Sequence, residues 1–160
     1  MLHGNWSGVI RKLETMEREL DAELRQTTAQ AAQLVESTAV GHLRNQDLGW
    51  TGLKAAYLAR KKTARGKGSR SLSEKILIAT GTYFQSITSY VEGLVAFVGV
   101  KRGVAREADG TDVLNLARIH EEGAPNANIP ARPLWKPTFD ECKPKVVRMF
   151  ANALKEVLRK

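Results

Sequence analysis

ARIHEEGAPNANIPARPLWKPTFDE, residues 117–141, is the stretch that constrains the fold most strongly. It opens like the end of an amphipathic helix, and after a loop it places Pro130, Pro133 and Pro137 around Trp135 before another helix begins. Proline fixes φ near about −65° and has no N–H, so this spacing excludes the interior of a sheet. The pattern predicts a stiff, extended segment, which we call the proline-rich arm, residues 129–137.

The length and composition predict one domain. The 160 residues suffice for a single core, and Lys and Arg outnumber Asp and Glu by 25 to 17, for a formal charge of +8. Such an excess favours polyanions or acidic protein surfaces as partners and does not determine the fold. Cys142 is the sole cysteine, which excludes an internal disulfide and favours a small buried hydrophobe in a reducing compartment. Neither a signal peptide nor a membrane span is evident, so we expect a soluble protein made in the cytosol.

Upstream of this stretch, apolar residues recur at steps of three and four from Trp6 to Val40. This period predicts an amphipathic helix on the order of 50 Å long if unbroken, which is more than a domain of this size can cover. Part of its apolar stripe is therefore expected to meet another subunit. The alternative is a kink near Thr27-Thr28 that gives two core helices.

A second helix is predicted at residues 52–62, followed by a flexible basic loop at residues 63–75. The residues expected to contact DNA or an acidic partner are Lys61, Lys62, Arg65, Lys67 and Arg70. A solvated loop is the alternative, because no aromatic residue interleaves with the charges to stack on bases. The fragment GKGS lacks the spacing of a phosphate-binding P-loop.

The pattern of residues 76–160 predicts two strands and two more helices. Alternating residues favour a β-hairpin at about Ser86 to Val100 with Glu92-Gly93 as its turn. Thr111 or Asp112 is expected to cap a short helix, and a terminal helix is expected from about Thr138, with Pro144 bending it or marking its first turn. The expected fold is a single α+β domain, residues 1–160, in which a long N-terminal helix and a C-terminal helix pack on a small antiparallel sheet. Residues 1–62 form its helical part and residues 76–160 its α+β part.

The order TGTYFQSI, a hairpin ending VAFVGV, then LARIHEEGAPNANIPARP and a closing helix resembles the tail-completion and virion-morphogenesis proteins of tailed bacteriophages, the minor tail or neck families. Members typically combine TG.L..SI, a strand ending V-G, an IHxxG box and IPARPF. The resemblance covers roughly the last half of the chain, and it departs at Glu122, where an apolar residue is common, and at Leu134, which replaces Phe. The matching residues are Thr80, Gly81, Ser86, Ile87, Val98, Gly99, Ile119, His120, Gly123, Ile129, Pro130, Ala131, Arg132 and Pro133.

The resemblance implies a structural virion protein without catalytic residues, metal or cofactor. Copies would form a homo-oligomeric ring, expected to be a hexamer, that completes the head-proximal end of the tail or the neck so that the tail joins the DNA-filled head. Its neighbours would be tail tube, tail terminator or head–tail connector proteins, and packaged DNA would be a non-specific contact. The protein would be assembled in the host cytoplasm and reside in the virion, away from any membrane.

A closed ring needs a donor surface and an acceptor surface on each subunit, and the arm is a candidate donor because proline narrows its unfolded ensemble. Leu134 and Trp135 would anchor it, and the Arg132 guanidinium suits Glu121 or Glu122 of the same or the next subunit. The alternative is an arm packed on its own chain. The residues predicted at the subunit interface are Ile129, Pro130, Arg132, Pro133, Leu134 and Trp135.

The residues give weaker support to two other classes of function, an enzyme and an independent nucleic-acid-binding module. His120 beside Glu121 and Glu122 lacks a second histidine at ligand spacing, and no hydrolase motif is present, so the sequence favours a partly buried histidine over a catalytic one. An independent nucleic-acid-binding module rests on net charge and the basic loop alone, without a recognisable reading motif. It stays the alternative to the assembly role.

Overall fold

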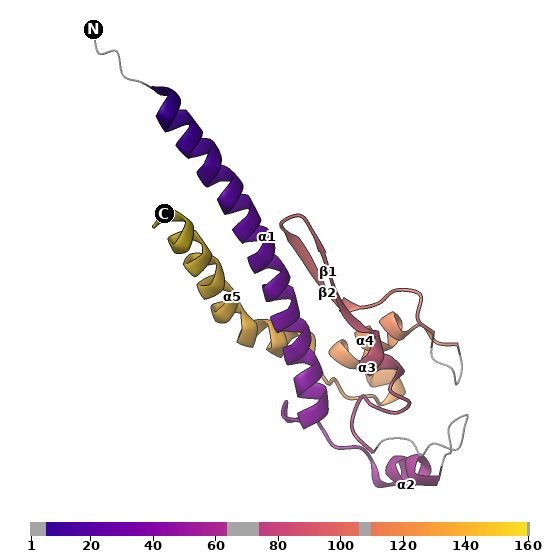
Figure 1. The fold of residues 1–160 in the computed structure, drawn as a ribbon. Coiled ribbons are helices and arrows are strands. Elements are labelled where there is room, and N and C mark those ends of the chain that lie inside the picture. The colour runs from indigo at the N-terminus through magenta and orange to yellow at the C-terminus, as the bar shows by residue number, and fades with distance from the viewer. Residues whose placement is uncertain (1–5, 64–73, 106–109, 160) are drawn as a thin grey trace.

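A computed structural model describes residues 6–63, 74–105 and 110–159. The chain folds as an α+β domain, which confirms the predicted fold class. In Figure 1, α5 runs back along α1 while the hairpin and the shorter helices gather beside the C-terminal half of α1. The elements are α1 (Trp6–Asn45), α2 (Ala55–Thr63), α3 (Thr82–Ser86), β1 (Ile87–Glu92), β2 (Val95–Val100), α4 (Val113–Glu122), the 3-10 helix η1 (Pro125–Ala127) and α5 (Trp135–Leu158).

Helix α1 is continuous over 40 residues, about 60 Å at about 1.5 Å per residue. The alternative of two helices separated by a kink near Thr27-Thr28 is wrong, because one α-helix runs from Trp6 to Asn45. Within it, the Thr28 hydroxyl donates to the carbonyl of Leu24 at 2.8 Å. The helix also runs past the predicted end at Val40 and through Gly41. Tertiary packing of its last turns, where Leu43 is fully buried, outweighs the low helix propensity of glycine.

The two strands form an antiparallel hairpin, as predicted. Its turn is Gly93-Leu94 rather than Glu92-Gly93, because Glu92 pairs with Val95. Gly93 has φ of 60°, a value that suits glycine at the first central position of a tight hairpin turn. One face of the hairpin packs on α1, where the hydroxyl of Ser89 donates to the carboxylate of Glu36.

Helix α5 begins at Trp135, three residues before the predicted start at Thr138, and Pro144 lies inside it. Pro144 cannot donate to the preceding turn, and in Figure 1 the first turns of α5 and its remainder run in different directions. Helix α5 packs along α1 through small buried side chains, which let the two backbones approach closely. Cys142 is buried, as expected. The buried residues of the two helices include Ala31, Ala32, Val35, Cys142, Ala153 and Val157.

The main core lies where α1, α3, β1, α4 and the arm meet. Asp112 caps α4 by accepting from the backbone nitrogen of Leu114 at 3.0 Å, which confirms one of the two predicted caps. Helix α3 was not predicted, and α2 begins at Ala55 instead of residue 52. The residues that form this core are Ala39, Leu43, Tyr83, Ile87, Val113, Ala117 and Leu134.

Candidate functional site

The junction between α4 and α5 is held by one carboxylate. Glu121, near the end of α4, accepts hydrogen bonds from the backbone nitrogens of Leu134 at 2.7 Å, Trp135 at 3.1 Å and Lys136 at 3.0 Å. The next residue is Pro137, which has no N–H to satisfy. Glu121 therefore supplies acceptors for the first donors of α5, and its negative charge lies at the positive end of the helix dipole.

This junction corrects the predicted pairing of Arg132 with Glu121 or Glu122. Glu121 is engaged with α5, and Glu122 faces Arg118, with 3.4 Å between Oε1 and Nε. Arg132 instead donates from Nε to the carbonyl of Thr51 at 3.2 Å. It is only 7% exposed, so its guanidinium lies within its own chain.

The arm also packs on its own domain through Leu134, which is 1% exposed and belongs to the core. The indole nitrogen of Trp50 donates to the carbonyl of Pro133 at 2.8 Å, and Trp135 packs in part against the core. The expectation that Leu134 reaches out to anchor a neighbouring copy is therefore wrong for this chain, because burying it completes the core. A subunit contact through the exposed residues Pro130 and Pro133 stays a prediction.

Gly123 fixes where the arm leaves α4. Its φ is 78°, and a Cβ at this position would lie 2.9 Å from the backbone nitrogen of Ala131. The nitrogen of Arg132 donates to the carbonyl of His120 at 2.6 Å, so the arm lies directly against the end of α4. The requirement for glycine here is steric, since a Cβ would collide with the returning backbone.

Two of the basic residues predicted to contact DNA have other roles. Lys61 is 4% exposed, and its ammonium group donates to the carbonyls of Lys75 at 3.0 Å and Ile78 at 3.3 Å. Burial lowers the pKa of Lys61, and attraction to Glu74 partly opposes this effect. Lys62 is exposed and lies 3.5 Å from Glu74. The prediction is wrong for Lys61; Arg65, Lys67 and Arg70 lie outside the described residues.

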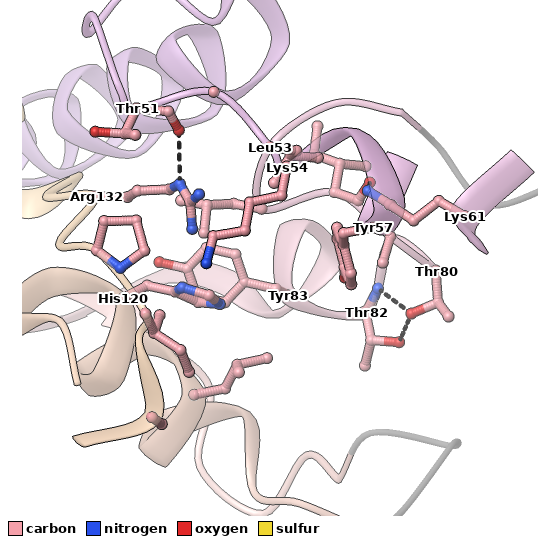
Figure 2. Close-up of a pocket in the computed structure, with 18 of the residues that line it drawn as sticks. Thr51, Leu53, Lys54, Tyr57, Lys61, Thr80, Thr82, Tyr83, His120 and Arg132 are labelled. Carbon is pink, nitrogen blue, oxygen red and sulfur yellow. Dashed lines mark hydrogen bonds between the residues drawn. The ribbon is translucent and has the colours of Figure 1, made fainter. Parts of the chain in front are cut away.

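A pocket of about 560 Å³ opens between the segment leading into α2, the loop before α3 and the arm. Figure 2 shows Arg132 and Lys54 pointing their nitrogen ends into the part of the pocket where Tyr83 and His120 lie. The rings of Tyr83 and His120 meet edge to face, with 6.5 Å between their centroids. His120 is partly buried, as the sequence predicted. Apolar side chains line much of the remaining wall, among them Leu53, Tyr57, Leu77, Ile78, Leu116 and Ile129.

Large apolar side chains remain exposed in several places away from the pocket, including α5, where Val147 is 62% and Leu158 63% exposed. The exposed side chains on α1 and on the hairpin bear on assembly. On α1, the stripe predicted from the sequence continues past the packed part of the helix as Trp6, Val9, Ile10 and Leu13. Trp6 is 68% exposed and Leu13 is 59% exposed. On the outer face of the hairpin, Tyr90 pairs directly with Phe97, and both are exposed.

Comparisons of this chain with protein-family models, with curated proteins and with solved structures found no match. The site must therefore be interpreted from its own geometry.

Neither a metal-ligating cluster nor a membrane-spanning helix occurs among the described residues. Residues 6–63, 74–105 and 110–159 contain no group of three or more potential metal-ligating side chains. Over the same ranges, no helix has the length and apolar character needed to cross a membrane. The pocket instead combines basic groups with apolar walls.

Sequence reasoning missed the role of Glu121 at the start of α5 and did not identify Lys54. Nothing in the pattern of IHEEG distinguishes Glu121, which caps α5, from Glu122, which faces solvent. Lys54 lies in no motif and joins the pocket only because the chain before α2 folds beside the arm. The sequence signal at this site was the pair of motifs IHEEG and IPARP, which marks both segments without specifying their contacts.

Proposed function

We propose that this protein is a structural component of a tailed-phage virion, a tail-completion or neck protein whose copies form a ring at the head-proximal end of the tail. The resemblance carried by IHEEG and IPARP supports the proposal. The observation that carries it furthest is the exposed apolar stripe of α1, made by Trp6, Val9, Ile10 and Leu13.

The stripe fits an assembly role because of its spacing and position. Residues 6, 9, 10 and 13 lie on one face of the helix, as steps of three and four require. In Figure 1 these turns of α1 project beyond the end of α5, so no described part of the same chain covers them. A contiguous apolar surface of this kind marks a contact between proteins, and burying it would offset the free-energy cost of association.

Ring assembly through α1 revises the role of the arm. Arg132 and Leu134 hold the arm to its own domain, so the arm shapes the subunit instead of swinging out of it. The exposed stripe then serves as one surface of the subunit contact. Closure into a ring requires that it meet a different surface of the next copy, and the exposed Tyr90–Phe97 pair on the hairpin is a second apolar surface available for this role.

The proposal is tested by the assembly state of the purified protein. Native mass spectrometry and negative-stain imaging are expected to show closed rings, and Leu13→Glu is expected to reduce them to monomers because it buries a carboxylate in the contact. Thr15→Glu is the matched control: it adds the same charge on the opposite, exposed face of α1 and should assemble normally.

A second assay addresses the place of the ring in the particle. Purified tails that lack this protein are expected to join filled heads only after the wild-type chain or Thr15→Glu is added, and Leu13→Glu should fail. Equal joining activity of Leu13→Glu and wild type would contradict assembly through the stripe. Failure of the wild-type chain to promote joining would contradict the neck role.

A further inference from the structure

The pocket beside the arm contains cations but no carboxylate among the residues that line it. Its charged lining residues are Lys54, Lys61 and Arg132. The ammonium group of Lys61 is engaged by two backbone carbonyls at the rim. Lys54 and Arg132 are the two charges directed into the open part of the pocket in Figure 2.

Arg132 is the decisive group. It is more than nine-tenths buried, yet its side chain makes one hydrogen bond within the described chain, from Nε to the carbonyl of Thr51. The two terminal nitrogens of the guanidinium point into the pocket (Figure 2). Glu121, the acidic residue at the adjoining end of α4, is held by the backbone of α5 and does not pair with Arg132.

This arrangement leaves cationic donors available to a ligand, because the terminal nitrogens of Arg132 open to the pocket. An anion bound there would be attracted by a guanidinium that is largely shielded from water and by the second cation beside it. A guanidinium with two free nitrogens on one edge matches the two oxygens of a carboxylate, and Lys54 can donate to the same anion. Burial raises the pKa of Tyr83, and the negative charge of Glu121 raises it further. The hydrogen bond with Trp135 lowers it by a smaller amount. The Tyr83 phenol thus stays protonated as a further donor.

The walls restrict the ligand further. Tyr57, Leu77, Ile78 and Ile129 give the pocket an apolar lining around its basic end. Pockets of this kind hold the apolar body of a ligand while a few polar groups fix its orientation. A bare phosphate or a nucleic-acid backbone would leave these walls without a partner.

We propose that this pocket binds a carboxylate carried on an apolar group, as found at the C-terminus of a peptide or at an acidic residue flanked by apolar ones, with Arg132 and Lys54 receiving the carboxylate. The proposal does not depend on ring assembly, since all the residues involved belong to one chain.

Ligand-observed NMR titration of the full-length protein tests it with two probes. N-acetyl-L-phenylalanine presents a terminal carboxylate, and N-acetyl-L-glutamyl-L-phenylalaninamide presents a side-chain carboxylate. Their neutral counterparts are N-acetyl-L-phenylalaninamide and N-acetyl-L-glutaminyl-L-phenylalaninamide. At least one acidic probe is expected to bind saturably, with its neutral counterpart weaker by about tenfold or more, the factor for one charge-assisted hydrogen bond. The acidic probe that binds more tightly identifies the source of the carboxylate.

Variants tie the binding to the pocket. Lys54→Gln removes the positive charge from an exposed side chain. It is expected to lower the affinity for the acidic probe about tenfold without changing the far-UV circular dichroism spectrum. Lys101→Gln makes the same change of charge on an exposed residue outside the pocket and should bind as wild type does. Arg132→Gln is expected to abolish saturable binding, and its folding is checked by the same spectrum.

Three outcomes would overturn the proposal: equal binding of the acidic and neutral probes, equal loss of affinity in Lys54→Gln and Lys101→Gln, or displacement of the acidic probe by inorganic phosphate or a short DNA duplex at the same concentration of anionic groups. The last result would mean that the basic end recognises phosphate.

Discussion

Removal of the Glu121 carboxylate should destabilise the junction between α4 and α5 strongly, because this one side chain accepts three backbone hydrogen bonds. In Glu121→Ala, the backbone nitrogens of Leu134, Trp135 and Lys136 lose their acceptor together. The donors of Leu134 and Trp135 are partly shielded from water, so solvent replaces the lost bonds incompletely. The perturbation also removes the negative charge from the N-terminal end of α5.

The magnitude follows from the three bonds. Hydrogen bonds to a charged acceptor contribute about 1.5–3 kcal/mol each when shielded, and an exposed one contributes about 0.5 kcal/mol. Two shielded bonds at the low end of this range and one exposed bond give a loss of about 3.5 kcal/mol for Glu121→Ala. Glu121→Gln keeps one carbonyl oxygen without charge, and we expect it to lose about half as much. Either loss is a large fraction of the total stability of a single domain, about 5–15 kcal/mol.

Urea unfolding followed by far-UV circular dichroism, at one fixed protein concentration, measures these losses. Glu122→Gln is the matched control, because it makes the same chemical change one residue away at an exposed pair with Arg118. We expect the control to change the free energy of unfolding by no more than about 0.5 kcal/mol. If Glu121→Gln and Glu122→Gln were equally stable, the assigned role of Glu121 would be refuted.

Gly123→Ala is expected to lower the free energy of unfolding by at least about 2 kcal/mol, because its φ is 78° and a Cβ would lie 2.9 Å from the nitrogen of Ala131. Gly41→Ala, which meets open space within α1, should raise it by about 0.5–1 kcal/mol, and the reverse order in urea unfolding would contradict this reasoning. Burial raises the pKa of Tyr83 above its unfolded value of 10.0, so the folded state favours the neutral phenol. The stability that the neutral Tyr83 contributes is fully present below about pH 10 and is lost as pH rises through the folded pKa. Tyr83→Phe should remove that decline in alkaline unfolding experiments, and an unchanged decline would exclude Tyr83 as its cause. Trp50→Phe, which deletes the indole donor to the arm, should cost about 1 kcal/mol by thermal unfolding, and an unchanged midpoint would mean that this bond contributes nothing.

The fold class could be predicted because its signals are local and periodic. The step of three and four along α1, the alternation through the hairpin and Asp112 before α4 each depend on residues close together in the sequence. Errors occurred where tertiary contacts override local preference. Helix α1 passes through Gly41 because Leu43 is buried beyond it, and α5 starts early because a carboxylate from another helix caps it.

The candidate site was predictable only in part. The arm and its neighbour IHEEG were identified as important, but the direction of Arg132 was not, because its partner is a backbone carbonyl of Thr51, which no sequence pattern indicates. The charge of Lys61 predicts contact with DNA or an acidic partner, yet its ammonium group donates to the carbonyls of Lys75 and Ile78 in its own chain. Charge alone does not distinguish a cation that faces solvent from one that holds two segments together.

The mass of the purified wild-type protein as a function of concentration tests the central claim most directly. Assembly through the exposed stripe of α1 predicts a closed oligomer of fixed copy number in equilibrium with a monomer of 17.7 kDa. Native mass spectrometry or light scattering should show that species growing in as concentration rises. A chain that remained a monomer at every accessible concentration would contradict the account.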